Sequence, residues 1–242
     1  MSYFLAEAPL NVGEIQELTG KEARHILLSR RIEIGEMIEI QGPDGKRFEA
    51  EVIDIDRKFL SIQAIQEIET PKESPLKITI FQALIKEQPL DNIIQKLTEL
   101  GVDTLALFYS QNSVERFKDI EKKLERWKKI TEEAAKQSGR VHPIKIEFLK
   151  DTDSIFAKAT ELDQLFLLHP STNQAFSTWT RSVQVDDIGI LVGQEGGFTD
   201  IEVANFLKLE NAVSVSMGPR ILRADTAAIS SAAIVQSLWG DM

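Results

Sequence analysis

The sequence predicts an α/β protein: a C-terminal domain built on a parallel sheet, preceded by a small N-terminal domain rich in strands. Three observations predict this. Short apolar runs alternate with segments of helical spacing from residue 77 onward, as in doubly wound sheets. Two of these runs lead through glycine-centred segments, LVGQEGGFTD (191–200) and SMGPRILRADTA (216–227), into predicted helices. Before residue 70, period-two alternation predicts strands instead.

The first 70 residues predict a compact β-barrel. Residues 37–56 alternate apolar and polar side chains on both sides of a Gly-Pro-Asp-Gly turn, which is typical of a hairpin. Residues 59–69 predict another strand, and residues 19–29 a short helix that Thr19 or Gly20 caps. Two prolines with polar residues between them mark residues 71–76 as a linker, so we expect domains at 1–70 and 77–242.

The C-terminal elements follow from apolar runs and from the glycines that end helices. The predicted strands are 76–84, 104–109, 144–148, 165–169, 188–192 and 212–215. The predicted helices include 89–100, which Gly101 ends, 120–138 and 223–238.

Composition narrows the class of protein. No apolar run approaches the roughly 18 residues that span a bilayer, and the N-terminus lacks the basic start of a signal peptide. The absence of cysteine excludes disulfides and thiolate metal sites, and three scattered histidines argue against any metal centre. We therefore expect a soluble, cytoplasmic protein that uses no metal and binds no membrane.

The net charge of −10 argues against a nucleic-acid partner, but the charge is unevenly distributed. Residues 116–145 hold ten Lys or Arg against five Asp or Glu. One interpretation is a solvated helix with Glu–Lys pairs at i,i+4 spacing. The other is one face of an RNA-binding surface.

Familiar catalytic motifs are missing from the glycine segments. LVGQEGG lacks the Gly-Lys-Ser/Thr of a phosphate-binding loop, and its glycines at 193, 196 and 197 do not fit the dinucleotide-binding pattern. The chain holds no Gly-x-Ser-x-Gly and no His-Glu-x-x-His. The two segments nevertheless predict a ligand site, because open α/β sheets bind ligands where strands end.

Both segments resemble the signature of the 16S ribosomal RNA uridine-N3 methyltransferases, a family of the SPOUT superfamily. The match includes GQEGGF (193–198) and MGPRILRADTA (217–227), and it extends to QK (95–96), ELGV (99–102), WKKI (127–130), EAAKQSGR (133–140) and LHP (168–170). Arg24-His25 and the residues from Gly35 to Gly45 are similar to the family's PUA-like RNA-binding barrel. The resemblance implies a SPOUT domain with a C-terminal trefoil knot, which periodicity alone does not predict.

The resemblance further implies an S-adenosylmethionine site built from three loops. Glycines in these loops let the main chain approach the ligand closely or take positive φ. The implied cofactor-binding residues are Leu168, His169, Pro170, Gly193, Glu195, Gly196, Gly197, Phe198, Ser216, Met217, Gly218, Ile221, Leu222, Arg223 and Thr226.

Methylating N3 of uridine requires loss of an imide proton, so the site must align the reactants, favour the deprotonated base and exclude water. Arg223 is the first candidate catalytic residue, since it can hold a phosphate or stabilise the uridine anion; its alternative role is a salt bridge to Asp225 or Glu195. Glu195 can accept the proton or orient a ligand, and it can equally cap a helix start. His169 has a structural alternative, as do Asp225 and Thr226 in a first helical turn.

Several arginines are candidates for RNA contact, although surface arginine is common. They are Arg24, Arg30, Arg31, Arg140 and Arg220.

Three positions depart from the family pattern. Gln194 stands where proline is usual, Ala224-Asp225 replace Thr-Glu, and Asn112 replaces a frequent arginine. The change at Asn112 bears most on RNA contact.

The expected function is therefore methylation of N3 of a uridine in 16S rRNA of the small ribosomal subunit. The alternatives are a non-catalytic RNA- or ribosome-binding protein with a degenerate cofactor site, and a nucleotide-binding metabolic enzyme. The resemblance also implies a homodimer, for which Ile229, Ala233, Leu238 and Trp239 offer apolar positions that can equally belong to the core.

Overall fold

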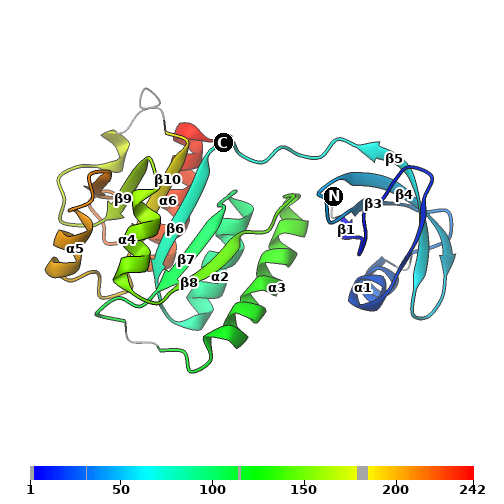
Figure 1. Cartoon of the computed structure of the whole chain (residues 1–242), viewed down its shortest axis with the longest axis horizontal. Helices are drawn as coiled ribbons and strands as arrows, with labels where there is room; N and C mark the ends of the chain where they lie inside the picture. Colours follow the sequence, from blue (N-terminus) through cyan, green and yellow to red (C-terminus); the bar gives the residue numbers. More distant parts are fainter. Residues whose placement is uncertain (1–2, 31, 114–115, 179–184) are drawn as a thin grey trace. The chain divides into compact units, whose positions relative to one another are not determined.

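The computed structural model describes residues 3–30, 32–113, 116–178 and 185–242 (Figure 1). Contacts divide the chain into two compact units, each of which is considered by itself. The first unit holds residues 1–72 together with 135–142, and the second holds residues 73–134 and 143–242.

The first unit is built on a five-stranded sheet in the order β1-β3-β4-β5-β2. Its hairpin joins β3 and β4 through a turn in which Gly45 has a φ of +83° and its amide donates to the Gly42 carbonyl (3.0 Å). This turn uses the positive φ that glycine tolerates, as the Gly-Pro-Asp-Gly segment predicts. The strands are β1 (Phe4–Leu5), β2 (Ile15–Leu18), β3 (Met37–Gln41), β4 (Arg47–Ile55) and β5 (Leu60–Ile68).

Helix α1 (Gly20–Arg30) packs its buried residues, among them Ala23 and Ile26, into the core of this sheet. Residues 135–142 join the same unit through main-chain contacts. The Tyr3 hydroxyl donates to the Arg140 carbonyl (2.6 Å), and the Arg47 guanidinium donates to the Gly139 carbonyl (2.6 Å).

The second unit is built on a six-stranded, all-parallel sheet in the order β11-β9-β10-β6-β7-β8. All six strands follow the predicted apolar runs, because strands buried on both faces of a parallel sheet are nearly continuously hydrophobic. They are β6 (Lys77–Ala83), β7 (Thr104–Phe108), β8 (Lys145–Leu149), β9 (Gln164–Leu168), β10 (Asp187–Val192) and β11 (Ala212–Val215).

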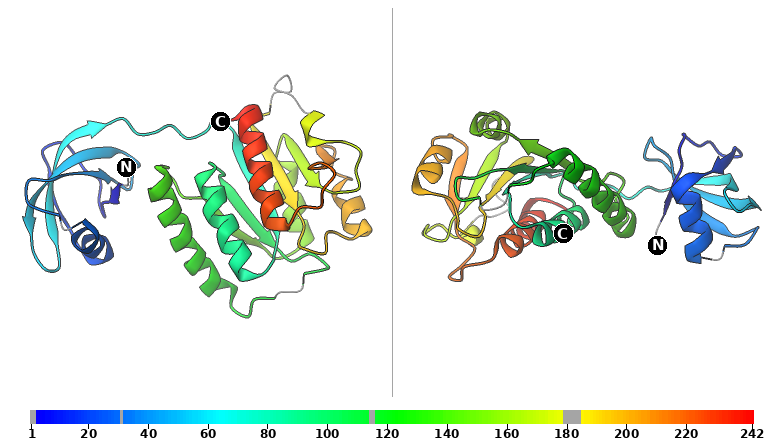
Figure 2. Two further views of the ribbon diagram at one scale, coloured as in Figure 1. Left: turned by 180° about the vertical axis from the view of Figure 1, so that it is seen from behind. Right: turned by 90° about the horizontal axis from the view of Figure 1, so that it is seen from below.

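Helices cover both faces of this sheet (Figure 2). Ile78 and Ile80 of β6 lie in the core with α2 (Glu87–Glu99), α3 (Ile120–Ser138) and α6 (Ala224–Trp239), whereas Phe81 and Ala83 face α4 (Thr152–Thr160) and α5 (Asp200–Phe206). A short 3-10 helix, η1 (Phe176–Thr178), follows β9. Helices α2 and α6 pack side by side on the first face. Their N-termini therefore lie at the edge where the parallel strands end.

The α/β class, the parallel sheet and the strand-rich N-terminal domain are confirmed. The trefoil knot stays a prediction. Within the described ranges, no helix is both long and apolar enough to cross a membrane.

Candidate functional site

A cavity of about 770 Å³ opens in the second unit where the strands of the parallel sheet end. Its walls come from four junctions that follow β6, β9, β10 and β11. The lining residues are Ile85, Lys86, Pro89, Leu168, His169, Pro170, Val192, Gly193, Gln194, Glu195, Gly196, Gly197, Phe198, Met217, Gly218, Arg220, Ile221, Leu222, Arg223, Ala224, Asp225 and Ala227.

The turn after β10 is held by the side chain of Gln194, which is only 5% exposed. Its Oε1 accepts a hydrogen bond from the Gly196 amide (2.6 Å), and its Nε2 donates to the Gly197 carbonyl (3.2 Å). The Gly197 amide donates to the Gln194 carbonyl (2.9 Å), and Gly197 takes a φ of +68°. A glutamine thus closes the turn at the position where the related family usually has proline.

The start of α5 fixes the other end of this turn. Thr199 and Glu202 form a capping box, in which each side chain bonds the main chain of the other. The loop after β7 approaches the same place, because the Gln111 amide donates to Glu202 Oε1 (2.8 Å) and Asn112 Nδ2 donates to the Gly197 carbonyl (3.4 Å). Asn112 therefore contacts the glycine turn itself.

The segment between β11 and α6 forms the opposite part of the lining. Ser216 uses its main chain to extend the sheet, since its amide donates to the Gln174 carbonyl (2.8 Å) and its carbonyl accepts from the Phe176 amide (3.0 Å). Gly218 follows with a φ of +97°, a conformation that favours glycine. Ile221 is 88% exposed although it lines the cavity.

Three cations line the cavity: Lys86, Arg220 and Arg223. None of them has an ion-pair partner in the described part of the chain, and the same holds for the lining carboxylates Glu195 and Asp225. Arg223 is the N-cap residue of α6 and makes no side-chain capping bond. The alternative role foreseen for Arg223, a salt bridge to Asp225 or Glu195, is not what the structure has.

The structure gathers most of the predicted site residues at this cavity, including both catalytic candidates, Arg223 and Glu195. Two cofactor candidates are not among the lining residues: Ser216, whose main chain is bonded within the sheet extension, and Thr226, which is exposed in the first turn of α6.

The predicted RNA contacts are spread more widely. Arg220 lines the cavity and is exposed, Arg24 is exposed on α1, and Arg140 lies in the first unit. Arg31 and the side chain of Arg30 lie outside the described residues.

Sequence reasoning missed the wall that follows β6, namely Ile85, Lys86 and Pro89. No glycine marks this junction, so the only available signal was its place at the end of a predicted buried strand.

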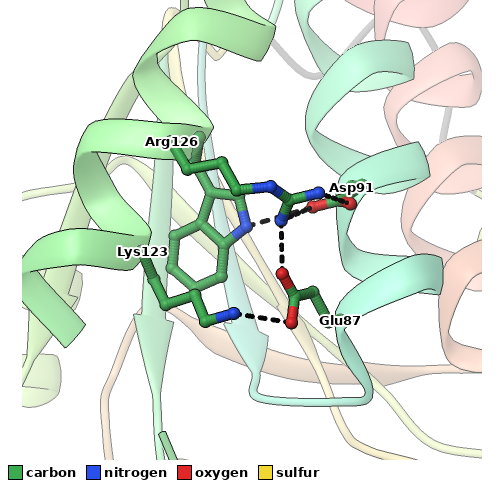
Figure 3. Close-up of polar contacts among 5 residues, drawn as sticks. Glu87, Asp91, Lys123 and Arg126 are labelled. Atoms are coloured by element: carbon green, nitrogen blue, oxygen red, sulfur yellow. Dashed lines mark hydrogen bonds and ion pairs between the residues drawn. The ribbon is translucent and has the colours of Figure 1, made fainter. Parts of the chain in front are cut away.

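Part of the basic stretch is occupied by contacts between helices α2 and α3 (Figure 3). Lys123 bonds Glu87 (2.6 Å), and Arg126 bonds both Glu87 (2.5 Å) and Asp91. Trp127, fully buried, donates from its indole nitrogen to Asp91 (3.2 Å). These two cations pair with carboxylates of another helix, a contact that neither interpretation of the sequence included, and for the rest of the stretch both interpretations stay predictions. We call Glu87, Asp91, Lys123 and Arg126 the α2–α3 charge network.

Comparison with known proteins supplies a family. A model described as "RNA methyltransferase domain" matches residues 72–236, and one described as "RNA methyltransferase PUA domain" matches residues 18–65. The ribosomal RNA small subunit methyltransferase E of Bacillus subtilis is 31% identical, over 87% of this chain and 85% of its own. The protein of the same name from Buchnera aphidicola is 28% identical, over 97% of this chain and 92% of its own.

A solved structure is also similar. The ribosomal RNA small subunit methyltransferase E from Neisseria gonorrhoeae, bound to S-adenosyl methionine, is 27% identical. The similarity covers 100% of this chain and 99% of the chain from Neisseria gonorrhoeae, with a TM-score of 0.88.

Proposed function

The chain belongs to the ribosomal RNA small subunit methyltransferase E family, and we propose that it methylates N3 of one uridine in 16S rRNA. It is an S-adenosylmethionine-dependent methyltransferase of small-subunit ribosomal RNA. The choice of N3 and of uridine is supported by the resemblance of the two glycine segments to the uridine-N3 family. The observation that carries the proposal is a single cavity that holds both segments, with Arg223 and Glu195 on its wall.

The residues of the cavity fit S-adenosylmethionine. The volume of about 770 Å³ lies within the range of small-molecule sites, roughly 300–1,000 Å³. Apolar side chains such as Leu168, Met217 and Leu222 offer a surface for the adenine, and the glycine turns at Gly197 and Gly218 bring main-chain polar groups close to it. When bound, S-adenosylmethionine supplies a methyl group on a sulfonium.

The protein's own part in the reaction is to favour the deprotonated uracil and to position it. Arg223 pairs with no acid in the described ranges and lies at the N-terminus of α6, so its guanidinium can stabilise the uridine anion together with the helix dipole. Glu195 can accept the N3 proton, because its carboxylate is exposed on the wall and bonds no described cation.

Binding of the RNA is assigned to both units. A PUA domain matches residues 18–65, and the candidate RNA contacts are Arg24, Arg30, Arg31, Arg140 and Arg220. Because ribosomal RNA is the substrate, the protein acts in the cytoplasm.

We further propose that the protein works as a homodimer. Ile221 presents an 88% exposed apolar side chain beside the cavity, and Ile229 of α6 is only partly buried. Leu238 and Trp239 instead pack against the core of the second unit, so the interface involves the start of α6 more than its end. Light scattering that finds a monomer at micromolar concentration overturns this part.

Two measurements test the proposed function. Calorimetry should detect S-adenosylmethionine binding, and mass spectrometry of digested 16S rRNA should find one 3-methyluridine that is missing from cells lacking the protein. Binding without that methylated base contradicts the N3-uridine assignment. Absence of binding at millimolar ligand favours the alternative, an RNA-binding protein with a degenerate cofactor site.

A further inference from the structure

Lys86 occupies an unusual position on the cavity wall. It is the N-cap residue of α2, is exposed, and makes no side-chain capping bond. N-caps favour Ser, Thr, Asp and Asn, and the positive end of the helix dipole disfavours a cation there. A lysine at this place costs local stability, so its presence beside a cavity indicates a use for its charge.

The carboxylates nearest to Lys86 along the chain do not neutralise it. Glu87 is bonded instead by Lys123 (2.6 Å) and Arg126 (2.5 Å) of α3, and the hydrogen bond with Lys123 is the main cause of its lowered pKa (Figure 3). Asp91, one turn further, bonds Arg126 and the Trp127 indole nitrogen. The α2–α3 charge network therefore engages both acids, and Lys86 has no ion-pair partner among the residues that the structure describes.

A second helix repeats the arrangement. Arg223 is the N-cap of α6, it likewise makes no capping bond, and α6 packs beside α2 (Figure 2). Two adjacent helices thus direct both their positive ends and their N-cap cations to one cavity, in a chain of net charge −10. With Arg220, the cations of the lining outnumber its two carboxylates, Glu195 and Asp225, so the described lining has a net positive charge that suits a ligand with anionic oxygens.

We propose that Lys86 binds a backbone phosphate of the RNA strand that presents the target nucleotide. The inference rests on the proposed function. Lys86 is exposed, which places its ammonium group where a strand outside the cavity can reach it. Lysine binds phosphate as a point charge on a flexible stem, without the fixed geometry that a bidentate arginine needs. The other anion in reach, the carboxylate of S-adenosylmethionine, is distinguished by experiment.

The test compares Lys86→Met and Lys86→Arg with the matched control Lys77→Met. Lys77 is exposed at the first position of β6, so the control removes the same charge from the other end of the strand that leads to Lys86. Four quantities are measured on the full chain: the Kd for S-adenosylmethionine, the Kd for a 16S rRNA fragment across salt concentrations, and the kcat and KM of methylation.

We expect Lys86→Met to weaken RNA binding about fivefold, the effect of one exposed ion pair. The slope of log K against log salt should fall by about 0.7 for a single-stranded phosphate contact. KM for RNA should rise with kcat unchanged, because the contact is the same in the ground and transition states. Lys86→Arg should retain the wild-type salt slope, and Lys77→Met should leave all four quantities unchanged.

Three results overturn the inference. If Lys86→Met keeps the RNA affinity and the salt slope of an active wild-type enzyme, the proposed function stands and the phosphate contact is rejected. Weakened S-adenosylmethionine binding with unchanged RNA binding assigns Lys86 to the carboxylate of the cofactor and also rejects it. If the wild-type protein binds no S-adenosylmethionine, the proposed function itself is rejected, and this measurement requires no variant.

Discussion

Replacing Gln194 by alanine tests how the cavity keeps its shape. The Gln194 side chain makes two hydrogen bonds that close the turn after β10, to the Gly196 amide (2.6 Å) and the Gly197 carbonyl (3.2 Å). Alanine removes both bonds and leaves the main-chain hydrogen bond from Gly197 to residue 194 in place. The change is therefore confined to the turn.

The magnitude follows from those two bonds. Each side-chain hydrogen bond contributes about 0.5–1.5 kcal/mol net, so Gln194→Ala forfeits about 1–3 kcal/mol. Gly196 is exposed, and water replaces part of the loss at its amide, which brings the expected value to about 1–2 kcal/mol. If this free energy keeps the turn in the conformation that binds S-adenosylmethionine, its loss in Gln194→Ala raises the Kd for S-adenosylmethionine about 5- to 30-fold.

Calorimetry with S-adenosylmethionine measures the effect, and Gln194→Pro serves as the comparison. The main-chain amide of Gln194 donates no hydrogen bond among the described residues, so proline removes no main-chain bond, although it lacks the two side-chain bonds just as alanine does. The fixed φ of proline restricts the turn that has lost those bonds. Gln194→Pro should therefore bind closer to wild type than Gln194→Ala does. Wild-type affinity in Gln194→Ala, or weaker binding in the proline variant than in the alanine variant, refutes the reasoning.

Three further predictions concern stability, each measured by urea or thermal unfolding. The hydrogen bond with Lys123 is the first cause of the lowered pKa of Glu87. The stabilisation from the Glu87 carboxylate is therefore complete above the ordinary pKa of Glu, about 4.3, and is lost as the pH falls through the lowered pKa of the folded state. Glu87→Gln should flatten this acid dependence of stability, and an unchanged pH profile contradicts the prediction. Trp127→Ala removes a fully buried indole and should cost about 3–5 kcal/mol, with a value under about 1 kcal/mol arguing against its place in the core. Gly101→Ala should cost more than about 1 kcal/mol, because Gly101 has a φ of +78° and an added Cβ would lie 2.6 Å from Gln236 Nε2; a neutral effect shows that the turn relaxes.

The strands, the long helices and the glycine junctions could be predicted from the sequence because each depends on local pattern. Helix α3 has the bounds that were predicted, and every strand of the parallel sheet lies within about two residues of its apolar run. That residues 168–170, 193–198 and 217–223 line one cavity could be predicted only from the resemblance to a known family. No local sequence pattern specifies which strand–helix junctions of a sheet are neighbours.

Charged side chains were less predictable. In the sequence, a lysine before a helix cannot be distinguished from an ordinary surface residue. Lys86 is therefore identified only by the structure, in which it lines the cavity. The partners of Lys123 and Arg126 lie on α2, and helical spacing within α3 could not identify them. In both cases the deciding fact is the packing of helices distant in sequence.

The strand order of the second unit has a consequence for how the protein is made. Strand β6 pairs on one side with β10, so that Lys77 is in register with Asp187, whereas the five strands of the first sheet are complete by residue 68. Pairing across such a separation requires closing a long loop first, which slows folding. During synthesis the first sheet can form while the ribosome is still adding the second unit, and the centre of the parallel sheet must wait until β10 has emerged. The cavity also needs the segment after β11, so the methyl-transfer site can form only once residues up to Ala227 have emerged.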